Sequence, residues 1–419
     1  MSKWPTTKIS DICTRIAMGP FGSNIKVDNF VPSGVPVLNG ANLAGFKLKE
    51  DSFNYVTEHK AEELKNSLAY RGDIVVTHRG TLGQIVYIPS DSRFDKYLIS
   101  QSQFLLRVDS DKADSRFITY FFHSVYGQYL LLSNASQVGV PALARPTSTF
   151  KSLEIPLPPL RIQKKIADFL CLLDKKVQLN AQINRNLEQQ AQAIFKSWFV
   201  DFEPFGGAIP SEWQETHLSQ IADFVSGYSY KGNELQPSDC AMATIKNFDR
   251  NGGFRLDGFK EIVPSGKLKD VQQVDLFDIL VAHTDLTQNA EVIGNTELIL
   301  SKAGYKKLIM SMDLVKVVSK SGISKFLLAS LLRSPQFKAH ALGYVNGTTV
   351  LHMSKSALPE YCFYFPTEWS SLEGISAALE RMYHKMSQTI EESQRLSTLR
   401  DTLLPKLMSG EIDVSEVEV

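Results

Sequence analysis

The amino-acid sequence is built from two copies of one plan. Trp4 and Trp213 lie 209 residues apart, and Phe117 and Phe326 keep the same offset. Twice this offset is almost the whole length of 419 residues. Between these anchors the offset drifts, so the two copies have gained and lost loop residues. A repeat of this length predicts two similar domains, each with its own loops.

Each copy ends in a segment almost free of glycine and proline, from residue 160 to about 202 and from about 369 to 408. Both segments carry a seam with alternating spacings of three and four residues, which is the heptad pattern of a coiled coil. About five heptads predict a first helix roughly 60 Å long, because a helix rises ~1.5 Å per residue. The first seam, which recurs 209 residues later in the same phase, runs through Ile166, Leu170, Leu173, Val177, Asn180, Asn184, Leu187, Ala191, Ile194 and Trp198.

Polar residues interrupt both seams at the same place, Asn180 and Asn184 in the first and Thr389 and Ser393 in the second. If the helices pair antiparallel, Asn180 faces Ser393 and Asn184 faces Thr389. Polar residues meet only in this register, and a buried polar pair can fix register at a cost in stability. Arg400 is the one misfit, and we expect its stem to pack while its guanidinium reaches solvent. The alternative is an amphipathic helix that packs on its own domain.

The regions outside these helices hold short β-like runs between glycine, proline, asparagine and aspartate residues. We therefore predict the α+β class, with two repeated α+β domains separated by two long helices that pair as an antiparallel coiled coil. The expected boundaries are 1–159 for the first domain, 160–204 for the first helix, 205–366 for the second domain, 367–412 for the second helix and 413–419 for a short acidic tail.

Composition excludes several classes of protein. Basic and acidic side chains number 45 each, so the net charge is zero. That excludes a protein that binds nucleic acid through bulk positive charge, although it leaves room for a local basic groove. No apolar run is long enough for a membrane helix, and the N-terminus lacks a secretory signal. The four cysteines lie far apart, which predicts reduced thiols in a cytoplasmic protein.

Signatures of common enzymes are missing from the sequence. We find no GxxxxGK[ST] phosphate loop, no strand–GxGxxG–helix cradle and no GxSxG elbow. Asp73 and Asp278 precede strand-like runs but lack the E-x-K partner with which nucleases hold a metal. We expect each of them to cap a turn, and we predict no catalytic residue and no metal site.

Polar loops at matching places in the two copies are the candidate binding elements. Residues 78–81 and 283–289 follow strand-like runs, and each copy has a second such loop, 136–139 in the first and 346–349 in the second. Arginine, asparagine, glutamine, serine and threonine are the residues that read base edges in the major groove of DNA. The alternative is that these are ordinary solvated loops.

Six segments stand out along the chain, in the order 19–23 (GPFGS), 72–77 (GDIVVT), 79–83 (RGTLG), 155–163 (IPLPPLRIQ), 198–202 (WFVDF) and 399–412 (LRDTLLPKLMSGEI). Together they resemble the specificity (S) subunit of type I restriction–modification systems, in the right order along the whole chain. Residues 284–285 depart from the pattern, because Thr-Asp stands where the first copy has Arg-Gly.

The resemblance implies a non-catalytic subunit that binds an asymmetric, two-part site on double-stranded DNA, one part for each target-recognition domain. Two modification subunits would supply S-adenosylmethionine and adenine methylation. Restriction subunits would add ATP- and Mg-dependent translocation and cleavage, and no cofactor is expected in this subunit. The alternatives are a subunit of a related modification-only or fused restriction enzyme, or a coiled-coil scaffold that binds no DNA.

The candidate DNA-binding residues come from these loops and from the early glycine loop, which begins with the segment 19–23 and runs on to residue 27. They are Ser23, Asn24, Lys26, His78, Arg79, Thr81, Gln137 and Arg145 in the first copy, and Lys231, His283, Thr284, Asn346, Thr348 and Thr349 in the second.

Overall fold

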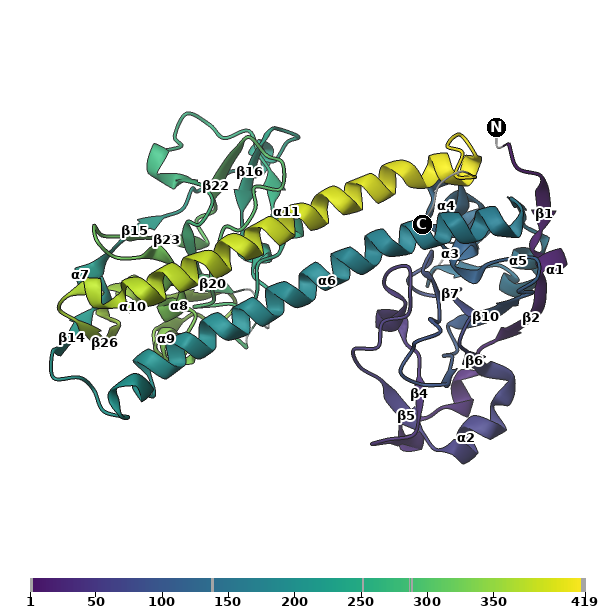
Figure 1. Cartoon of the computed structure of the whole chain (residues 1–419), viewed down its shortest axis with the longest axis horizontal. Coiled ribbons are helices and arrows are strands. Elements are labelled where there is room, and N and C mark those ends of the chain that lie inside the picture. Colours follow the sequence, from purple (N-terminus) through teal and green to yellow (C-terminus); the bar gives the residue numbers. More distant parts are fainter. Residues whose placement is uncertain (1–2, 137–138, 251, 286, 288, 416–419) are drawn as a thin grey trace. The chain divides into compact units, whose positions relative to one another are not determined.

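The computed structural model describes residues 3–136, 139–250, 252–285, 287 and 289–415. The chain divides into two compact units, of which unit 1 holds Met1–Lys175 and Leu396–Val419 and unit 2 holds Lys176–Arg395. Each unit is an α+β domain together with one part of each of two long helices, α6 (Leu160–Phe199) and α11 (Glu373–Ser409). Figure 1 shows α6 in teal and α11 in yellow. No helix among the described residues is both long and apolar enough to cross a membrane.

The core of unit 1 is an antiparallel sheet that is buried on both faces. Successive side chains of a strand point to opposite faces of the sheet, so Ile74 and Val76 contact one hydrophobic cluster while Val75 contacts another. The sheet has the order β2 (Cys13–Met18), β10 (Gln103–Val108), β7 (Ile74–Thr77) and β8 (Ile85–Tyr87). Helices α3 (Ser115–His123) and α4 (Val125–Leu132) follow it in sequence, and Phe117 and Phe121 of α3 pack into the first cluster.

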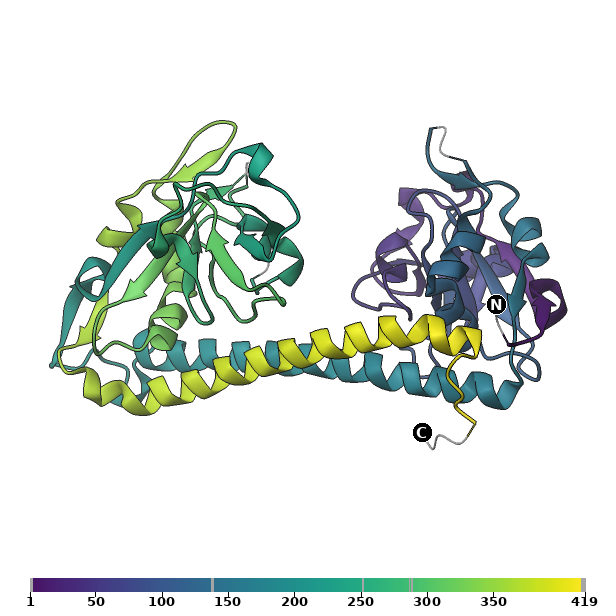
Figure 2. The same ribbon diagram turned by 90° about the horizontal axis from the view of Figure 1, so that it is seen from above.

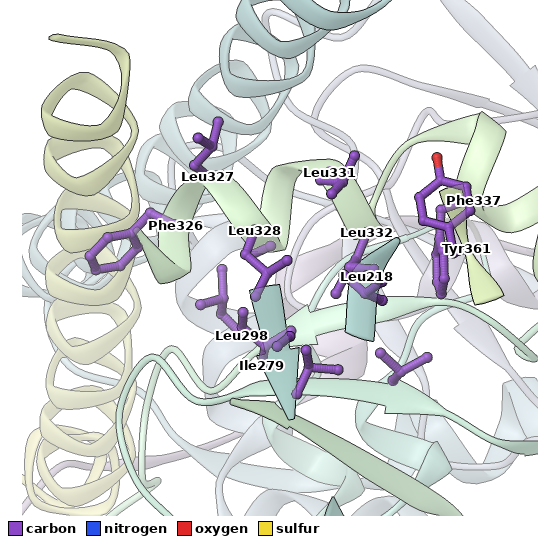
Figure 3. Packing of buried hydrophobic residues seen from close by; sticks show 14 of the residues in the cluster. Leu218, Ile279, Leu298, Phe326, Leu327, Leu328, Leu331, Leu332, Phe337 and Tyr361 are labelled. Carbon is purple, nitrogen blue, oxygen red and sulfur yellow. The ribbon is translucent and has the colours of Figure 1, made fainter. Parts of the chain in front are cut away.

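Unit 2 repeats this sheet with the same strand order, which identifies the two units as copies of one fold. The order is β15 (Ala222–Ser226), β23 (Leu314–Ser319), β19 (Ile279–Ala282) and β21 (Thr296–Leu298). Helix α8 (Lys325–Leu332) corresponds to α3, and α9 (Pro335–Leu342) corresponds to α4. Figure 3 shows Leu328 of α8 beside Leu298 of β21 and Ile279 of β19.

A second sheet in each unit has the same pattern, including one parallel pair among antiparallel neighbours. In unit 1 its order is β3 (Phe30–Val31), β5 (Asn54–Val56), β4 (Val35–Val37), β9 (Lys96–Leu98) and β6 (Leu68–Tyr70). In unit 2 its order is β17 (Lys260–Glu261), β16 (Cys240–Ala243), β22 (Lys307–Met310) and β18 (Gln273–Val274).

A two-stranded ribbon joins the two ends of each domain's chain. In unit 1, β1 (Thr6–Lys8) pairs with β13 (Glu154–Pro156), just before α6 begins. In unit 2, β14 (Trp213–His217) pairs with β26 (Cys362–Pro366), shortly before α11 begins. Each long helix therefore starts from the edge of a folded domain.

Both long helices are shorter than the ranges 160–204 and 367–412 that the sequence suggests. Helix α6 ends at Phe199, because Phe202 adopts a left-handed backbone with φ of 51° and a short 3-10 turn follows. A 3-10 turn from Trp369 to Leu372 precedes α11. Gly410, with φ of 75°, ends α11, and such a left-handed residue is a common helix terminator.

Within each unit the parts of α6 and α11 pair side by side in opposite directions (Figure 1 and Figure 2). In unit 1 the seam joins Ile166 and Leu170 to Leu404 and Leu407 in one hydrophobic cluster. In unit 2 the polar layer lies in the seam. The side-chain amide of Asn180 donates to Ser393 Oγ at 3.2 Å, and the Thr389 hydroxyl donates to Asn184 Oδ1. These are the pairs that the antiparallel register predicts.

The expectation for Arg400 is wrong in one respect. Its guanidinium is bound within unit 1 rather than left in solvent, and the side chain is only 16% exposed. It donates to Asp174 Oδ1 at 2.6 Å and lies over the ring of Phe46, 4.5 Å from the centroid. Asp174 also accepts a hydrogen bond from the Tyr120 hydroxyl. An acidic partner one position from the seam and an aromatic ring of the domain thus hold the charge inside unit 1.

The long helices also pack on the domains. The coiled coil and the helix packed on its own domain, which the sequence analysis gave as alternatives, are therefore both present. In unit 1, Gln163 of α6 accepts from the Asp114 backbone N–H at 2.9 Å and donates to the Pro158 carbonyl at 2.8 Å. In unit 2, Ser387 of α11 donates to the Leu300 carbonyl at 2.7 Å. Each helix is therefore held by its domain as well as by its partner helix.

Candidate nucleic-acid interface

In unit 1, two polar loops that are distant in sequence meet in one small structure. Strand β11 (Ala135–Ser136) pairs with β12 (Ala142–Leu143) as a hairpin. The residues after β7 pair with the β12 edge of this hairpin. Leu143 N–H donates to the His78 carbonyl and Gly80 N–H donates to the Pro141 carbonyl, both at 2.8 Å. Arg79 itself forms a bridge with Ala142. The loop 78–81 and the hairpin therefore present one surface.

The early glycine loop borders the same surface. Gly19 N–H donates to the Gln103 carbonyl at 2.8 Å, and a Cβ at this position would lie 1.9 Å from the Ser100 carbonyl oxygen. His78 N–H donates to the Ser102 carbonyl, and His78 Nε2 lies 3.1 Å from the Gln101 carbonyl. The turn at 100–102 thus connects the glycine loop to His78. Glycine is required at position 19 because any side chain would meet backbone there.

Unit 2 contains the same arrangement. Strand β20 (Thr284–Asp285) pairs with β25 (Leu351–Met353), which pairs in turn with β24 (Val345–Asn346). His283 N–H donates to the Asp313 carbonyl at 2.8 Å, and the His283 carbonyl accepts from Met353 N–H at 2.9 Å. A Cβ at Gly227 would lie 1.9 Å from the Ser311 carbonyl oxygen, as at Gly19. The two units therefore carry equivalent loop clusters with different side chains.

The candidate residues differ in their exposure to solvent. Thr284 is buried, and its hydroxyl donates to Asp313 Oδ1 at 3.0 Å, so it faces the interior of the unit. His78 and His283 are half-buried. Gln137 lies outside the described residues. Ten candidates are exposed, namely Ser23, Asn24, Lys26, Arg79, Thr81, Arg145, Lys231, Asn346, Thr348 and Thr349.

The two histidines offer hydrogen bonds rather than charge. Burial lowers the pKa of His78 and of His283 below the ordinary value of 6.5. A neutral imidazole at pH 7 has one donor and one acceptor nitrogen. These rings therefore suit a hydrogen bond to a polar group or a positioning role, and the positive charge of the surface comes from the exposed lysines and arginines.

Arg145 has the most unusual backbone of the candidates. Its φ of 47° and ψ of 56° place it in the left-handed region directly before Pro146, where helix α5 (Pro146–Ser152) begins. Arginine seldom adopts this conformation, and such strain gathers at functional sites. The Arg145 carbonyl holds the turn by accepting from Thr149 N–H at 2.9 Å. The strained turn sets an exposed arginine next to the hairpin.

The two aspartates before the strands have structural partners. Asp73 is buried, accepts from Tyr70 N–H at 2.9 Å and forms two bonds of 2.7 Å with the Arg107 guanidinium. Asp278 accepts from Asp275 N–H at 3.0 Å. Both cap the turn before their strand, as expected. In the described part of the chain, no group of three or more histidine, cysteine or acidic side chains is placed to hold a metal.

The sequence analysis missed two helix residues that hydrogen-bond to the residues following the candidate loops. Gln128 of α4 donates to the Gly83 carbonyl at 3.0 Å, and Lys338 of α9 donates to the Glu291 carbonyl at 3.0 Å and to Asn295 Oδ1 at 2.8 Å. Both stand four residues after a serine, Ser124 or Ser334, that caps its helix. The matched serine caps are the signal that could have revealed them.

Comparison with known families gives a match to the model described as type I restriction modification DNA specificity domain, over residues 1–189. Two curated relatives match almost the whole chain. The type I restriction enzyme MjaIX specificity subunit of Methanocaldococcus jannaschii is 22% identical, with 99% of this chain and 94% of the relative covered. The type I restriction enzyme HindI specificity subunit of Haemophilus influenzae is 24% identical, with 98% and 100% covered.

Among solved structures, the S subunit of a type I restriction–modification system from M. genitalium has the same fold. It matches with a TM-score of 0.61 and 17% sequence identity, and 97% of this chain and 96% of that chain are covered. The fold with two α+β domains and two long helices has therefore been seen in a solved protein.

Proposed function

We propose that the chain is a specificity subunit of a type I restriction–modification system, which its similarity to specificity subunits supports, and that it reads a two-part DNA site, with one part for each unit. The observation that carries this proposal is the duplicated loop cluster. The same backbone hydrogen bonds join the loops in both units, while Arg79 and Gly80 of one are replaced by Thr284 and Asp285 in the other. A common scaffold with different side chains suits the reading of two different base sequences.

The chemistry of the exposed side chains supports this assignment. Arg79 and Arg145 in unit 1 can each donate in a bidentate manner to guanine, and Asn346 in unit 2 can pair with adenine. Lys26 and Lys231 stand on the bordering loops, where they can contact phosphate. Each unit thus combines side chains that read bases with side chains that fix position.

We propose that the subunit is itself non-catalytic and works with partner proteins. Two modification subunits would bind it, supply S-adenosylmethionine and methylate adenine. Restriction subunits would supply the ATP- and Mg-dependent steps. The aspartates that precede β7 and β19 support this division of labour, because Asp73 is bound by Arg107 and Asp278 caps a turn.

Substitution of one loop should change one half of the recognised site. In a complex with two modification subunits, Arg79→Ala should relax recognition at one base pair of one half-site, and Asn346→Ala should do so in the other half-site. Each lost base contact is worth about 1–3 kcal/mol. The measurement is the methylated motif, read by sequencing of DNA modified by each variant.

The matched control is Arg161→Ala, which removes an exposed arginine from α6, away from the loops. We expect it to leave the motif unchanged. If Arg79→Ala and Asn346→Ala altered the same half-site, the assignment of one half-site to each unit would be wrong.

DNA affinity should depend strongly on the partner subunits. With 45 basic and 45 acidic side chains, the isolated chain has little net attraction to phosphate and should bind DNA weakly. Affinity, measured by fluorescence anisotropy at fixed salt, should rise sharply when two modification subunits are added. Tight and sequence-selective binding by the isolated chain would contradict this expectation, and no selectivity in any complex would favour a protein scaffold.

A further inference from the structure

The glycine loop of unit 1 carries two large apolar side chains that are almost fully exposed. Phe21 is 83% exposed, and Val27 is 81% exposed. Phe21 is the most exposed aromatic residue in the described part of the chain. A single exposed apolar residue needs no explanation, but here two of them share one short loop with the polar residues Ser23, Asn24 and Lys26. This mixture is unusual for a solvated turn.

The loop is held rigidly, so Phe21 cannot easily fold back onto the domain. The Phe21 carbonyl accepts from Asn24 N–H at 2.8 Å, which closes a 3-10 turn over Gly22–Asn24. Gly19 N–H, at the start of the loop, donates to the Gln103 carbonyl at 2.8 Å. Backbone hydrogen bonds therefore anchor the loop beside the turn 100–102, which also contacts His78. A loop anchored in this way keeps its tip projecting without a large entropic cost on binding.

Unit 2 has a shorter segment at this place. Lys231 begins the turn Gly232–Glu234 and its N–H donates to Glu234 Oε2 at 2.6 Å, as Lys26 begins the turn Val27–Asn29 and its N–H donates to Asn29 Oδ1 at 2.8 Å. Lys26 and Lys231 are therefore equivalent. Six residues separate Gly19 from Lys26 but only three separate the equivalent Gly227 from Lys231, and the two tyrosines of the shorter segment are buried or half-buried. The longer segment thus gives unit 1 an exposed aromatic ring that unit 2 lacks there.

From this asymmetry we infer that Phe21 is a wedge that inserts between base pairs and unstacks the duplex in the half-site read by unit 1. The inference rests on the proposed function. Proteins that distort DNA commonly insert an apolar side chain at a base step, and flanking polar residues fix the backbone around it. Ser23, Asn24 and Lys26 are placed for such backbone contacts. The shorter segment of unit 2 exposes no aromatic ring of this kind, so we expect the half-site read by unit 2 to stay stacked.

The test uses the full chain bound to two modification subunits, without S-adenosylmethionine, and duplexes with 2-aminopurine at successive positions of both half-sites. The fluorescence of 2-aminopurine rises when the base is unstacked. With the unaltered chain we expect a rise at one step of the unit 1 half-site, in addition to any rise at the target adenine itself. Phe21→Ala should abolish the rise at that step and weaken binding about 10-fold, as expected for the loss of one stacked aromatic ring.

Two further variants separate a wedge from a general effect. Phe21→Leu should keep most of the rise, because leucine can still fill the step. Val27→Ala should leave the position of the rise unchanged. Because these side chains are exposed, the variants should fold normally, which circular dichroism and sedimentation would verify.

Two results would overturn the inference while leaving the proposed function intact. One is sequence-selective DNA binding with no rise outside the target adenine. The other is a rise that survives Phe21→Ala while that variant loses a modification subunit, because Phe21 would then be a protein contact. If no complex showed sequence-selective binding at all, the proposed function would fail first.

Discussion

Asp174→Ala should lower the free energy of unfolding of unit 1 by about 3 kcal/mol, because it removes the buried partner of a mostly buried positive charge. Asp174 accepts from Arg400 at 2.6 Å and from the Tyr120 hydroxyl, and the Arg400 side chain is only 16% exposed. One carboxylate thus connects α6, α11 and α3. Chemical denaturation, followed by circular dichroism, would measure the loss in the transition of unit 1.

The chain offers a matched control on the same arginine. Asp401 also contacts Arg400, at 2.8 Å, but its side chain is 62% exposed. Asp401→Ala should therefore change the unfolding free energy by less than about 1 kcal/mol, as is usual for exposed pairs. The double substitution Asp174→Ala and Arg400→Met should recover much of the loss, since methionine can pack beside Phe46 without a charge. An equal loss of unfolding free energy in the two aspartate variants would show that the buried pair stabilises unit 1 no more than the exposed pair does.

Matched insertions in the two long helices should widen the gap between the two parts of the recognised site. Helices α6 and α11 each pass from one unit into the other. Seven residues inserted after Val177 and seven after Arg395 preserve the heptad phase of both seams. They add roughly 10 Å of helix at ~1.5 Å per residue. That corresponds to about three base pairs of duplex.

The methylated motif is again the measurement. We expect the bases of each half-site to stay the same while the number of unspecified bases between them grows. A four-residue insertion in α6 alone is the control, since it shifts one seam against the other and should disturb helix pairing. An unchanged gap after the matched insertion would mean that the helices do not set the spacing.

The pairing of the long helices could be predicted from the sequence because both its phase and its register are local properties. A heptad seam is visible in a few turns of sequence, and the polar residues Asn180, Asn184, Thr389 and Ser393 mark the register without reference to any other part of the chain. The hydrogen bonds in unit 2 join the same pairs. The duplication was equally visible, since it needs only a constant offset.

The tertiary structure alone decided how the candidate loops assemble and which of their residues face outward. Nothing local to residues 78–80 indicates that their backbone pairs with residues 141–143, because that pairing depends on the order of the strands. The burial of Thr284 against Asp313 also depends on the order of the strands. Arg400 shows the same limit, since a heptad rule sees only the partner helix and not Asp174 or the Phe46 ring. The periodicity of a sequence shows which face of a helix or strand is apolar. The partners of a polar group are instead set by contacts between segments that are far apart in the chain.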